Sequence, residues 1–263
     1  MRSRFSTLLL VLLATAGCCS GSASHAPEPK EIVDLSPRLT PSSACELIGR
    51  RTCDFLGIPP HDPFTPVVPA DPNHSYGLMT FTLLSHAGAH LDAPGRLLRN
   101  GALADQVPLG RLYGPARLWD LRWHDRHTPL QITDLSQLPA VKPGEILLLF
   151  TGYTPPAPDD WPVYTWLSPQ AASWLAHQHI RALATDMPSI DSFQQGAQLL
   201  DRNRPPEEVW AAHLPLFEAG IPVIEGLVHL DALEDQSRIT FVGFPLAIPD
   251  RSGAPMRAVA LVY

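Results

Sequence analysis

The stretch Ser85-His-Ala-Gly-Ala-His-Leu-Asp-Ala-Pro-Gly-Arg96 decides how this chain folds and what it can bind. It places two imidazoles and a carboxylate, those of His86, His90 and Asp92, within seven residues. A straight helix cannot bring all three together, because the side chain six positions after the first points well round from it. The glycine between the histidines and the proline after the carboxylate favour a turn. A turn would create a ligand set for zinc or another borderline divalent metal; the alternative is a strand end that carries surface histidines.

Length and composition are typical of a globular chain that does not bind nucleic acid. The 263 residues are 45% hydrophobic, which is enough to bury a sizeable core. The formal net charge is -7 and no basic stripe is present, so a phosphate backbone is excluded as a partner. The 29 prolines are interspersed with apolar runs, and they therefore predict turns and long ordered loops rather than disorder.

The beginning of the chain predicts an export signal. Arg2 and Arg4 precede an apolar run over residues 8–16, which is too short to cross a membrane. The sequence Ala-Gly-Cys that ends at Cys18 is typical of a bacterial lipoprotein signal, and it predicts lipidation of this cysteine. We expect an exported bacterial protein, either periplasmic or anchored to the membrane as a lipoprotein.

These features divide the chain into three parts. Residues 1–17 are predicted to be a signal peptide of the lipoprotein type, although cleavage near residues 22–24 is an alternative. Residues 18–30 are rich in Ser, Ala, Pro and charge, and predict a flexible tether. Residues 31–263 are left as one folded domain.

Two cysteines remain after the signal region, Cys45 and Cys53. In an oxidising compartment they can form a disulfide. On a straight helix their Cα atoms would lie about 12 Å apart, so a disulfide requires a loop between them. Two free buried thiols are the alternative.

The apolar pattern predicts more strands than helices. Strands are expected at residues 31–36, 78–84, 116–121, 145–151, 182–185, 221–225, 238–242 and 257–262. One helix is expected after Ser168 as N-cap and Pro169 as first residue, and a second over residues 205–214. Residues 37–75 are rich in proline and predict an ordered loop region. A strand-helix-strand unit is present, so the fold class is α/β, with a single domain and a mixed β-sheet.

The stretch His86-Ala-Gly-Ala-His-Leu-Asp-Ala-Pro-Gly-Arg96 closely resembles the H-x-G-T-H-x-D-x-P-x-H signature of the cyclase-like metal-dependent hydrolases. That family includes bacterial kynurenine formamidase and isatin hydrolase. Further segments resemble the family in the same order along the chain, at residues 32–36, 185–191, 213–227, 244–248 and 253–258. The resemblance covers residues 31–263 and implies the family's swivelling β/β/α fold.

The resemblance also implies five metal ligands. His86 and His90 would bind a first ion and His213 a second, while Asp92 and Glu225 would bridge the two. The expected cofactor is a divalent metal, zinc or else manganese, as one or two ions; open positions would remain for water and substrate.

Other residues are expected to assist this centre. The resemblance raises a supporting role for Asp186, Ser189 and Asp191, which follow a predicted strand; the alternative is a capped turn. His61 and His74 lie in the proline-rich loop region and are candidates for a proton-transferring base, although surface histidines are the simpler interpretation.

Two positions depart from the family signature. Ala89 stands where the family has threonine, so a hydroxyl that could orient a ligand is missing. Arg96 stands where the family has its catalytic histidine. Arginine has no acceptor atom and does not lose its proton, so it cannot shuttle one. It can stabilise an oxyanion or hold a substrate carboxylate.

The resemblance implies a metal-dependent amidohydrolase that acts on a non-peptide C–N bond of an amide or cyclic amide, with metal-activated water as the nucleophile. Three readings of Arg96 follow. Catalysis persists with Arg96 as the substrate-polarising group, or the protein is a catalytically impaired metal-dependent binder of small molecules, or the reaction has changed within hydrolysis or lyase chemistry. The expected partner is a small-molecule substrate. A membrane is expected only through the lipid anchor, and the resemblance allows a homo-oligomer.

Overall fold

The computed structural model describes residues 27–39, 53, 64–68, 78–81, 83–157, 160–192 and 205–263. The signal peptide, Cys18, His61 and His74 lie outside these residues, and the predictions about them stay predictions. Cys53 is disulfide-bonded. Its expected partner, Cys45, also lies outside the described residues, so this pairing stays a prediction too. Within the described part of the chain, no helix has both the length and the apolar character needed to cross a bilayer.

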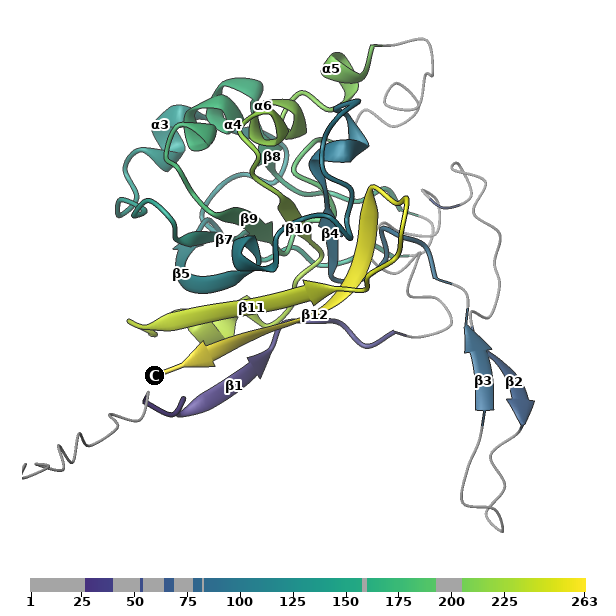
Figure 1. Cartoon of the computed structure of the whole chain (residues 1–263). Coiled ribbons are helices and arrows are strands. Elements are labelled where there is room, and N and C mark those ends of the chain that lie inside the picture. The colour runs from purple at the N-terminus through teal and green to yellow at the C-terminus, as the bar shows by residue number, and fades with distance from the viewer. Residues whose placement is uncertain are drawn as a thin grey trace, which may run out of the picture.

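The fold is built on an eight-stranded mixed sheet that closes on itself (Figure 1). Its strands are β1 (Glu31–Asp34), β4 (His90–Asp92), β5 (Tyr113–Asp120), β7 (Ile146–Phe150), β9 (Ala182–Thr185), β10 (Val223–Glu225), β11 (Ile239–Pro245) and β12 (Gly253–Val262). The order is β1-β12-β11-β5-β7-β9-β10-β4, and β4 also pairs with β12. Every strand except β1 therefore belongs to a closed ring. The predicted α/β class and mixed sheet are confirmed.

Strand direction divides the ring in two. The neighbours β5, β7, β9 and β10 run parallel. All the other pairings in the ring are antiparallel, including those of the long strand β12 with both β11 and β4. The chain returns between the parallel strands through helices, which lie on the outside of the ring, as parallel strands require.

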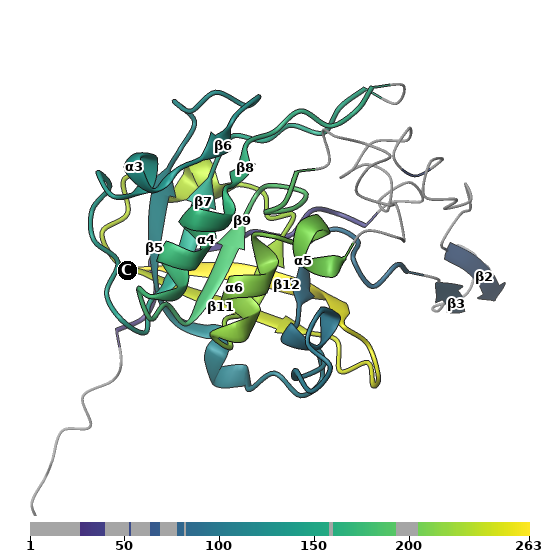
Figure 2. The same ribbon diagram turned by 90° about the horizontal axis from the view of Figure 1, so that it is seen from above.

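Side chains alternate along each strand, and this alternation creates two cores. In β7, Ile146, Leu148 and Phe150 belong to the core inside the ring. Leu147 and Leu149 point the other way, into a second core beneath the helices. Helices α4 (Pro169–Ala176) and α6 (His213–Glu218) cover this outer face (Figure 2). Strand β7 is buried on both faces, which explains why its sequence is a continuous apolar run.

Helix α4 begins where its sequence predicts. The hydroxyl of Ser168 accepts a hydrogen bond from the backbone N–H of Ala171 at 3.1 Å, and Pro169 is the first helical residue. This cap satisfies one of the N–H groups that the first turn leaves without a partner, and the fixed φ of proline suits that position.

The single helix expected over residues 205–214 is wrong. The structure has two shorter helices there, α5 (Pro206–Val209) and α6. Proline lacks the N–H that a continuing helix needs, and its ring clashes with the carbonyl four residues earlier. Pro215 therefore fits only in the first turn of a new helix, and α6 starts at His213, two residues before it.

The loop region expected over residues 37–75 contains a strand that the sequence did not predict. Strand β2 (Phe64–Val68) pairs with β3 (Leu78–Phe81) as a hairpin that lies apart from the ring (Figure 1). The register shifts between Pro66 and Val68, which is how a strand accommodates a proline. The remaining described elements are β6 (Pro129–Leu130), β8 (Trp166–Leu167), α3 (Ile132–Leu135), and the short 3-10 turns η1 (Pro94–Arg96), η2 (Leu109–Arg111) and η4 (Leu230–Leu233).

Candidate metal centre

Strands β4 and β10 place three of the predicted ligands on the outer face of the ring. His90 and Asp92 are two residues apart in β4 and therefore share a side of the strand, while Leu91 between them points into the inner core. Strand β10 is antiparallel to β4, and Glu225 stands directly opposite His90 in the ladder. All three side chains are buried.

The turn before β4 brings in the fourth residue, as the sequence predicted. Gly88 has a φ of +60°, a conformation that glycine adopts without strain. The rings of His86 and His90 meet edge to face with their centroids 5.2 Å apart. Nδ1 of His90 lies 2.9 Å from the carbonyl oxygen of Gly88. The proton therefore sits on Nδ1, and Nε2 is left to face the cluster as a lone-pair donor.

His213 completes the cluster from the start of α6. Its Nδ1 lies 2.5 Å from Oδ2 of Asp191, which fixes the tautomer by accepting the Nδ1 proton. The other oxygen of Asp191 accepts a hydrogen bond from the N–H of Ala212 at 2.8 Å, so one carboxylate orients both the ring and the backbone. Nε2 of His213 points at two carboxylates, 3.3 Å from Glu225 and 3.4 Å from Asp92.

The five predicted ligands thus meet in two groups that share one carboxylate. The outer group is His86, His90 and Asp92, and the inner group is Asp92, His213 and Glu225. Within each group the candidate ligand atoms lie within 4.8 Å of one another. This geometry brings together segments that are far apart in the sequence, at the place where β4, β10 and α6 converge.

Two buried atoms of the cluster have no hydrogen-bond partner among the described residues, Oδ1 of Asp92 and Nε2 of His213. Leaving a carboxylate oxygen and an imidazole nitrogen buried without partners is costly. Oδ1 of Asp92 faces ring nitrogens of His86 and His90, at 2.5 and 3.6 Å, whereas a divalent cation would satisfy Nε2 of His213. Carboxylate with imidazole is a donor set that zinc and manganese accept. The residues present therefore fit a divalent metal.

Both carboxylates are ionised at neutral pH despite their burial. Burial raises the pKa of Asp92, but the positive charge of Arg96 and the neighbouring imidazoles outweigh burial and hold it well below its ordinary value. Burial also raises the pKa of Glu225, and the neighbouring imidazoles of His213 and His90 outweigh it and lower the pKa to about 2. The centre thus presents two negative charges to a cation.

The imidazoles respond to the same surroundings in opposite ways. Burial lowers the pKa of His86. Burial would also lower the pKa of His213, but the neighbouring carboxylates of Asp191, Asp92 and Glu225 favour the charged ring, outweigh burial and raise the pKa well above its ordinary value. A proton on Nε2 of His213 and a metal ion there compete for the same lone pair, which is why metal binding at such sites releases protons.

Arg96 reaches directly into the cluster. Its Nη1 donates to Oδ2 of Asp92 and to Nδ1 of His86, the latter at 2.9 Å. The guanidinium lies over the ring of Trp210, 4.2 Å from the ring centroid, in a cation–π contact. The same ring packs edgewise against His213 at 5.6 Å between centroids. Trp210 was not predicted as part of the site; it stands three residues before His213, and only the structure shows that it also covers Arg96.

Gly253 is a second residue that sequence reasoning missed. It pairs with Asp92 in the β12–β4 ladder, next to the ring of His86. A Cβ at this position would come within 2.3 Å of Cε1 of His86. Only glycine leaves room for the histidine ring, and the sole signal in the sequence is a glycine within a segment expected to form a closing strand.

The segment after β9 supports the inner group through hydrogen bonds to Glu225 and His213. The N–H of Ile190 donates to Oε1 of Glu225 at 2.8 Å, and Asp191 holds His213 as described above. The hydroxyl of Ser189 accepts a hydrogen bond from the N–H of Asp191 at 3.2 Å and shapes the turn that carries these groups.

Asp186 lies in the same segment but contacts a different part of the protein. Its buried carboxylate accepts hydrogen bonds from the backbone N–H groups of Thr151 and Tyr153, both at 3.0 Å. Burial raises the pKa of Asp186, and these hydrogen bonds only partly offset it. Asp186 therefore anchors the loop after β7, and it contacts none of the five clustered residues.

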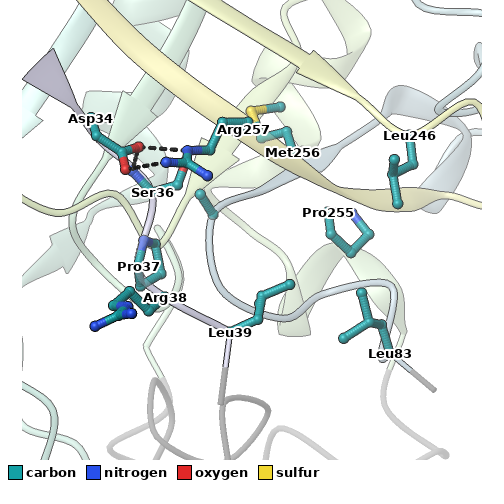
Figure 3. Close-up of a pocket in the computed structure, with 11 residues that line it drawn as sticks. Asp34, Ser36, Pro37, Arg38, Leu39, Leu83, Leu246, Pro255, Met256 and Arg257 are labelled. Carbon is teal, nitrogen blue, oxygen red and sulfur yellow. Dashed lines mark hydrogen bonds and ion pairs between the residues drawn. The ribbon is translucent and has the colours of Figure 1, made fainter. Parts of the chain in front are cut away.

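A pocket of about 380 Å³ lies beside the β4–β12 ladder (Figure 3). Ala89 and Pro255 line it near β4, Leu246 lines its far side, and the ion pair between Asp34 and Arg257 closes one end. None of the five clustered residues belongs to its lining. The pocket is therefore distinct from the cluster.

Known proteins resemble this chain in both sequence and fold. The family model "Putative cyclase" matches residues 33–192. The kynurenine formamidase of Salinibacter ruber is 30% identical over 196 residues, which cover 70% of this chain and 80% of that protein. The kynurenine formamidase of Bacillus cytotoxicus is 28% identical over 181 residues, covering 68% and 77%.

Two solved structures show the same fold. Isatin hydrolase A from Labrenzia aggregata, bound to benzyl benzoate, has a TM-score of 0.67 at 21% identity and covers 88% of this chain and 93% of its own. An isatin hydrolase bound to the product analogue thioisatinate has a TM-score of 0.66 at 20% identity, covering 88% and 92%. Because the family model spans more than half of the chain and a curated relative is 30% identical, this protein belongs to the cyclase family.

Proposed function

We propose that this protein is a metal-dependent hydrolase that cleaves a C–N bond in an amide or a cyclic amide. The observation that carries the proposal is the pair of ligand groups that share Asp92 and leave Nε2 of His213 buried without a hydrogen-bond partner among the described residues. The curated relatives are kynurenine formamidases and the solved structures of like fold include isatin hydrolases, which supports amide hydrolysis as the reaction.

Hydrogen bonds within the chain orient two of the candidate ligands in the absence of a cation. Nδ1 of His90 is held by the carbonyl of Gly88, and Nδ1 of His213 by the carboxylate of Asp191, so both Nε2 atoms face the centre. When bound, a divalent metal supplies an activated water at neutral pH and polarises the substrate carbonyl. Zinc suits this mixture of imidazole and carboxylate, and manganese is the alternative.

Arg96 is proposed to act on the substrate in place of the family's catalytic histidine. Its contacts among the described residues run through Nη1 and through the face that lies on Trp210. The N–H groups on Nε and Nη2 are left to bind the carbonyl oxygen of an amide, where negative charge grows during attack by water. Its side chain is 18% exposed, so this edge is reachable from solvent.

The direct test measures metal content and turnover together. Purified protein saturated with zinc or manganese should hydrolyse at least one member of a panel of N-formyl anilines, isatin and lactones. His90→Ala should lower metal content, whereas Arg96→Ala should keep the metal and lose turnover. Arg122→Ala is the matched control, because this arginine also lies over an aromatic ring, that of Phe150, but outside the cluster. A metal-loaded parent that hydrolyses nothing in the panel, or an active Arg96→Ala variant, would contradict the proposal.

The second candidate is a metal-dependent binding protein, and the ion pair of Arg96 with Asp92 is the observation that favours it. Without a histidine to move a proton, turnover is expected to be about 10²- to 10⁴-fold slower than with one. The two functions differ in single-turnover experiments. A binder would return the same molecules unchanged after prolonged incubation with excess protein, whereas a slow hydrolase would return product.

We further propose that the protein is exported and lipidated at Cys18, because residues 1–18 have the composition of a lipoprotein signal. The test is growth with a labelled fatty acid. The parent should carry the label, and Cys18→Ala should not. A parent chain that stays unlabelled would contradict lipidation, and its recovery in the cytoplasm would contradict export.

A further inference from the structure

Arg96 places a permanent positive charge where the outer group would hold its metal. Nη1 contacts Asp92 and His86, which are two of the three members of that group. Nδ1 of His86 is engaged on both sides, because it lies 2.9 Å from Nη1 of Arg96 and 2.5 Å from Oδ1 of Asp92. A guanidinium does not give up its proton at any physiological pH.

The ring of His86 has little room to turn and present Nε2 to a metal instead of Nδ1. The ring lies against Gly253, where even one added carbon would be 2.3 Å from Cε1 and 2.8 Å from both ring nitrogens. The guanidinium is also held in place, because Trp210 lies beneath it at 4.2 Å. A metal in the outer group would therefore have to displace a charged side chain that is fixed on two sides.

The inner group shares only one atom with Arg96, Oδ2 of Asp92, which lies 3.4 Å from Nε2 of His213. Arg96 contacts neither His213 nor Glu225, and Nε2 of His213 has no partner among the described residues. Oδ2 of Asp92 accepts from Arg96, but a carboxylate oxygen has a second lone pair and can bind a cation at the same time. The inner group therefore keeps three usable ligand atoms.

The charge balance points the same way. Asp92, Glu225 and Asp191 bring three carboxylates to the cluster, and Arg96 offsets one of them. One divalent ion balances the remaining two negative charges. A second divalent ion would leave two uncompensated positive charges in a buried site, which is strongly unfavourable.

We propose that this protein holds a single divalent metal, bound by Asp92, His213 and Glu225, and that Arg96 is the second cation of the centre. The guanidinium takes the place of a metal at His86 and His90. The inference rests on the proposed function, because it assumes a metal-binding centre, and it adds the number of ions and their place.

The test is metal stoichiometry in the full chain. The parent and Arg96→Met are saturated with zinc, freed of excess by gel filtration, and analysed for zinc per chain. Arg122→Met is the matched control, because it removes an arginine that is ion-paired with Asp120 at 2.7 Å and stacked on an aromatic ring away from the cluster. The parent and the control should bind one ion, and Arg96→Met should bind two.

The position of each ion is tested by deleting one ligand at a time. His86→Ala should leave the single ion of the parent in place, and in the Arg96→Met background it should remove the second ion only. His213→Ala should empty the parent. Anomalous diffraction at the zinc edge on crystals of the parent needs no variant and should show one peak, between Asp92, His213 and Glu225.

Two ions in the parent, or no second ion in Arg96→Met, would overturn the inference. So would a single anomalous peak at His86 and His90. These outcomes differ from a failure of the proposed function. A parent with one ion at the inner group that hydrolyses nothing leaves the inference standing, whereas a parent and an Arg96→Met variant that both bind no metal overturn both.

Discussion

Asp191→Asn tests how the centre sets the tautomer of His213. The carboxylate accepts from the backbone N–H of Ala212 through one oxygen and from Nδ1 of His213 through the other. An asparagine has only one acceptor oxygen. If that oxygen serves Ala212, the amide NH₂ faces Nδ1 and moves the imidazole proton to Nε2, where it blocks the metal. If the oxygen serves His213, the NH₂ meets the N–H of Ala212, and two buried donors oppose each other.

The structure allows a magnitude for both outcomes. The side chain of Asp191 is 7% exposed and that of His213 is 0% exposed, so solvent relieves little of either cost. Losing a carboxylate that orients a ligating histidine typically lowers metal affinity by about 10- to 100-fold, which is about 1.4 to 2.8 kcal/mol. A buried N–H left without an acceptor costs about 1–3 kcal/mol of unfolding free energy. We expect both metal affinity and stability to fall, and affinity by at least about tenfold.

The assay is a competition titration of zinc against a chromophoric chelator, with unfolding in denaturant measured on the same preparations. Asp186→Asn is the matched control, because this buried carboxylate also accepts backbone N–H groups and lies five residues earlier, but it contacts the loop at Thr151 and Tyr153 instead. The control should lose stability and keep zinc affinity. If Asp191→Asn binds zinc as tightly as the parent, the proposed role of His213 as an oriented ligand is wrong.

Three further predictions follow from other contacts. Gly253→Ala should push the ring of His86 aside, lower the unfolding free energy by about 1–3 kcal/mol and leave the zinc content unchanged; a ring resonance of His86 at the parent's chemical shift would contradict this. Arg257 lowers the pKa of Asp34 below its ordinary value of 3.8, mainly by a side-chain hydrogen bond (Figure 3). The ion pair therefore stabilises the fold above pH 3.8 and loses this effect as pH falls through the lowered pKa, so the melting temperature of Arg257→Gln should lie below the parent's at pH 7 and meet it in acid. Removing the metal with a chelator should lower the unfolding free energy by about 2.7 kcal/mol relative to protein at a hundredfold excess of metal over its dissociation constant; equal melting curves would contradict metal binding to the folded state.

The sequence predicted those parts of the fold that depend on neighbouring residues. The strand at β7 followed from an unbroken apolar run, and the start of α4 from Ser168 and Pro169 in the cap positions. The turn before β4 followed from Gly88, whose φ of +60° few other residues adopt easily. Each of these signals acts within a few residues and needs no knowledge of the rest of the chain.

Other parts could not be predicted in this way. Strand β2 contains Pro66, which argues against a strand unless the partner accommodates it, and the partner lies beyond a long connection. The break between α5 and α6 depends on Pro215, which lies one residue beyond the stretch 205–214 whose own composition favours a helix. The missing N–H of proline breaks the helix at Pro215, whereas the pairing of β2 with β3 accommodates Pro66 through a shift of register.

The sequence by itself determined which candidate ligand residues this protein carries, and its resemblance to the cyclase-like signature predicted that Arg96 stands where the family has a histidine. Only the tertiary structure decided that the ligands form two groups sharing Asp92, that Gly253 makes room for His86, and that Trp210 holds Arg96 in place. The physical reason is that strand alternation fixes the side of the sheet on which each side chain lies, whereas closure of the ring through the β4–β12 and β4–β10 ladders fixes what it meets there.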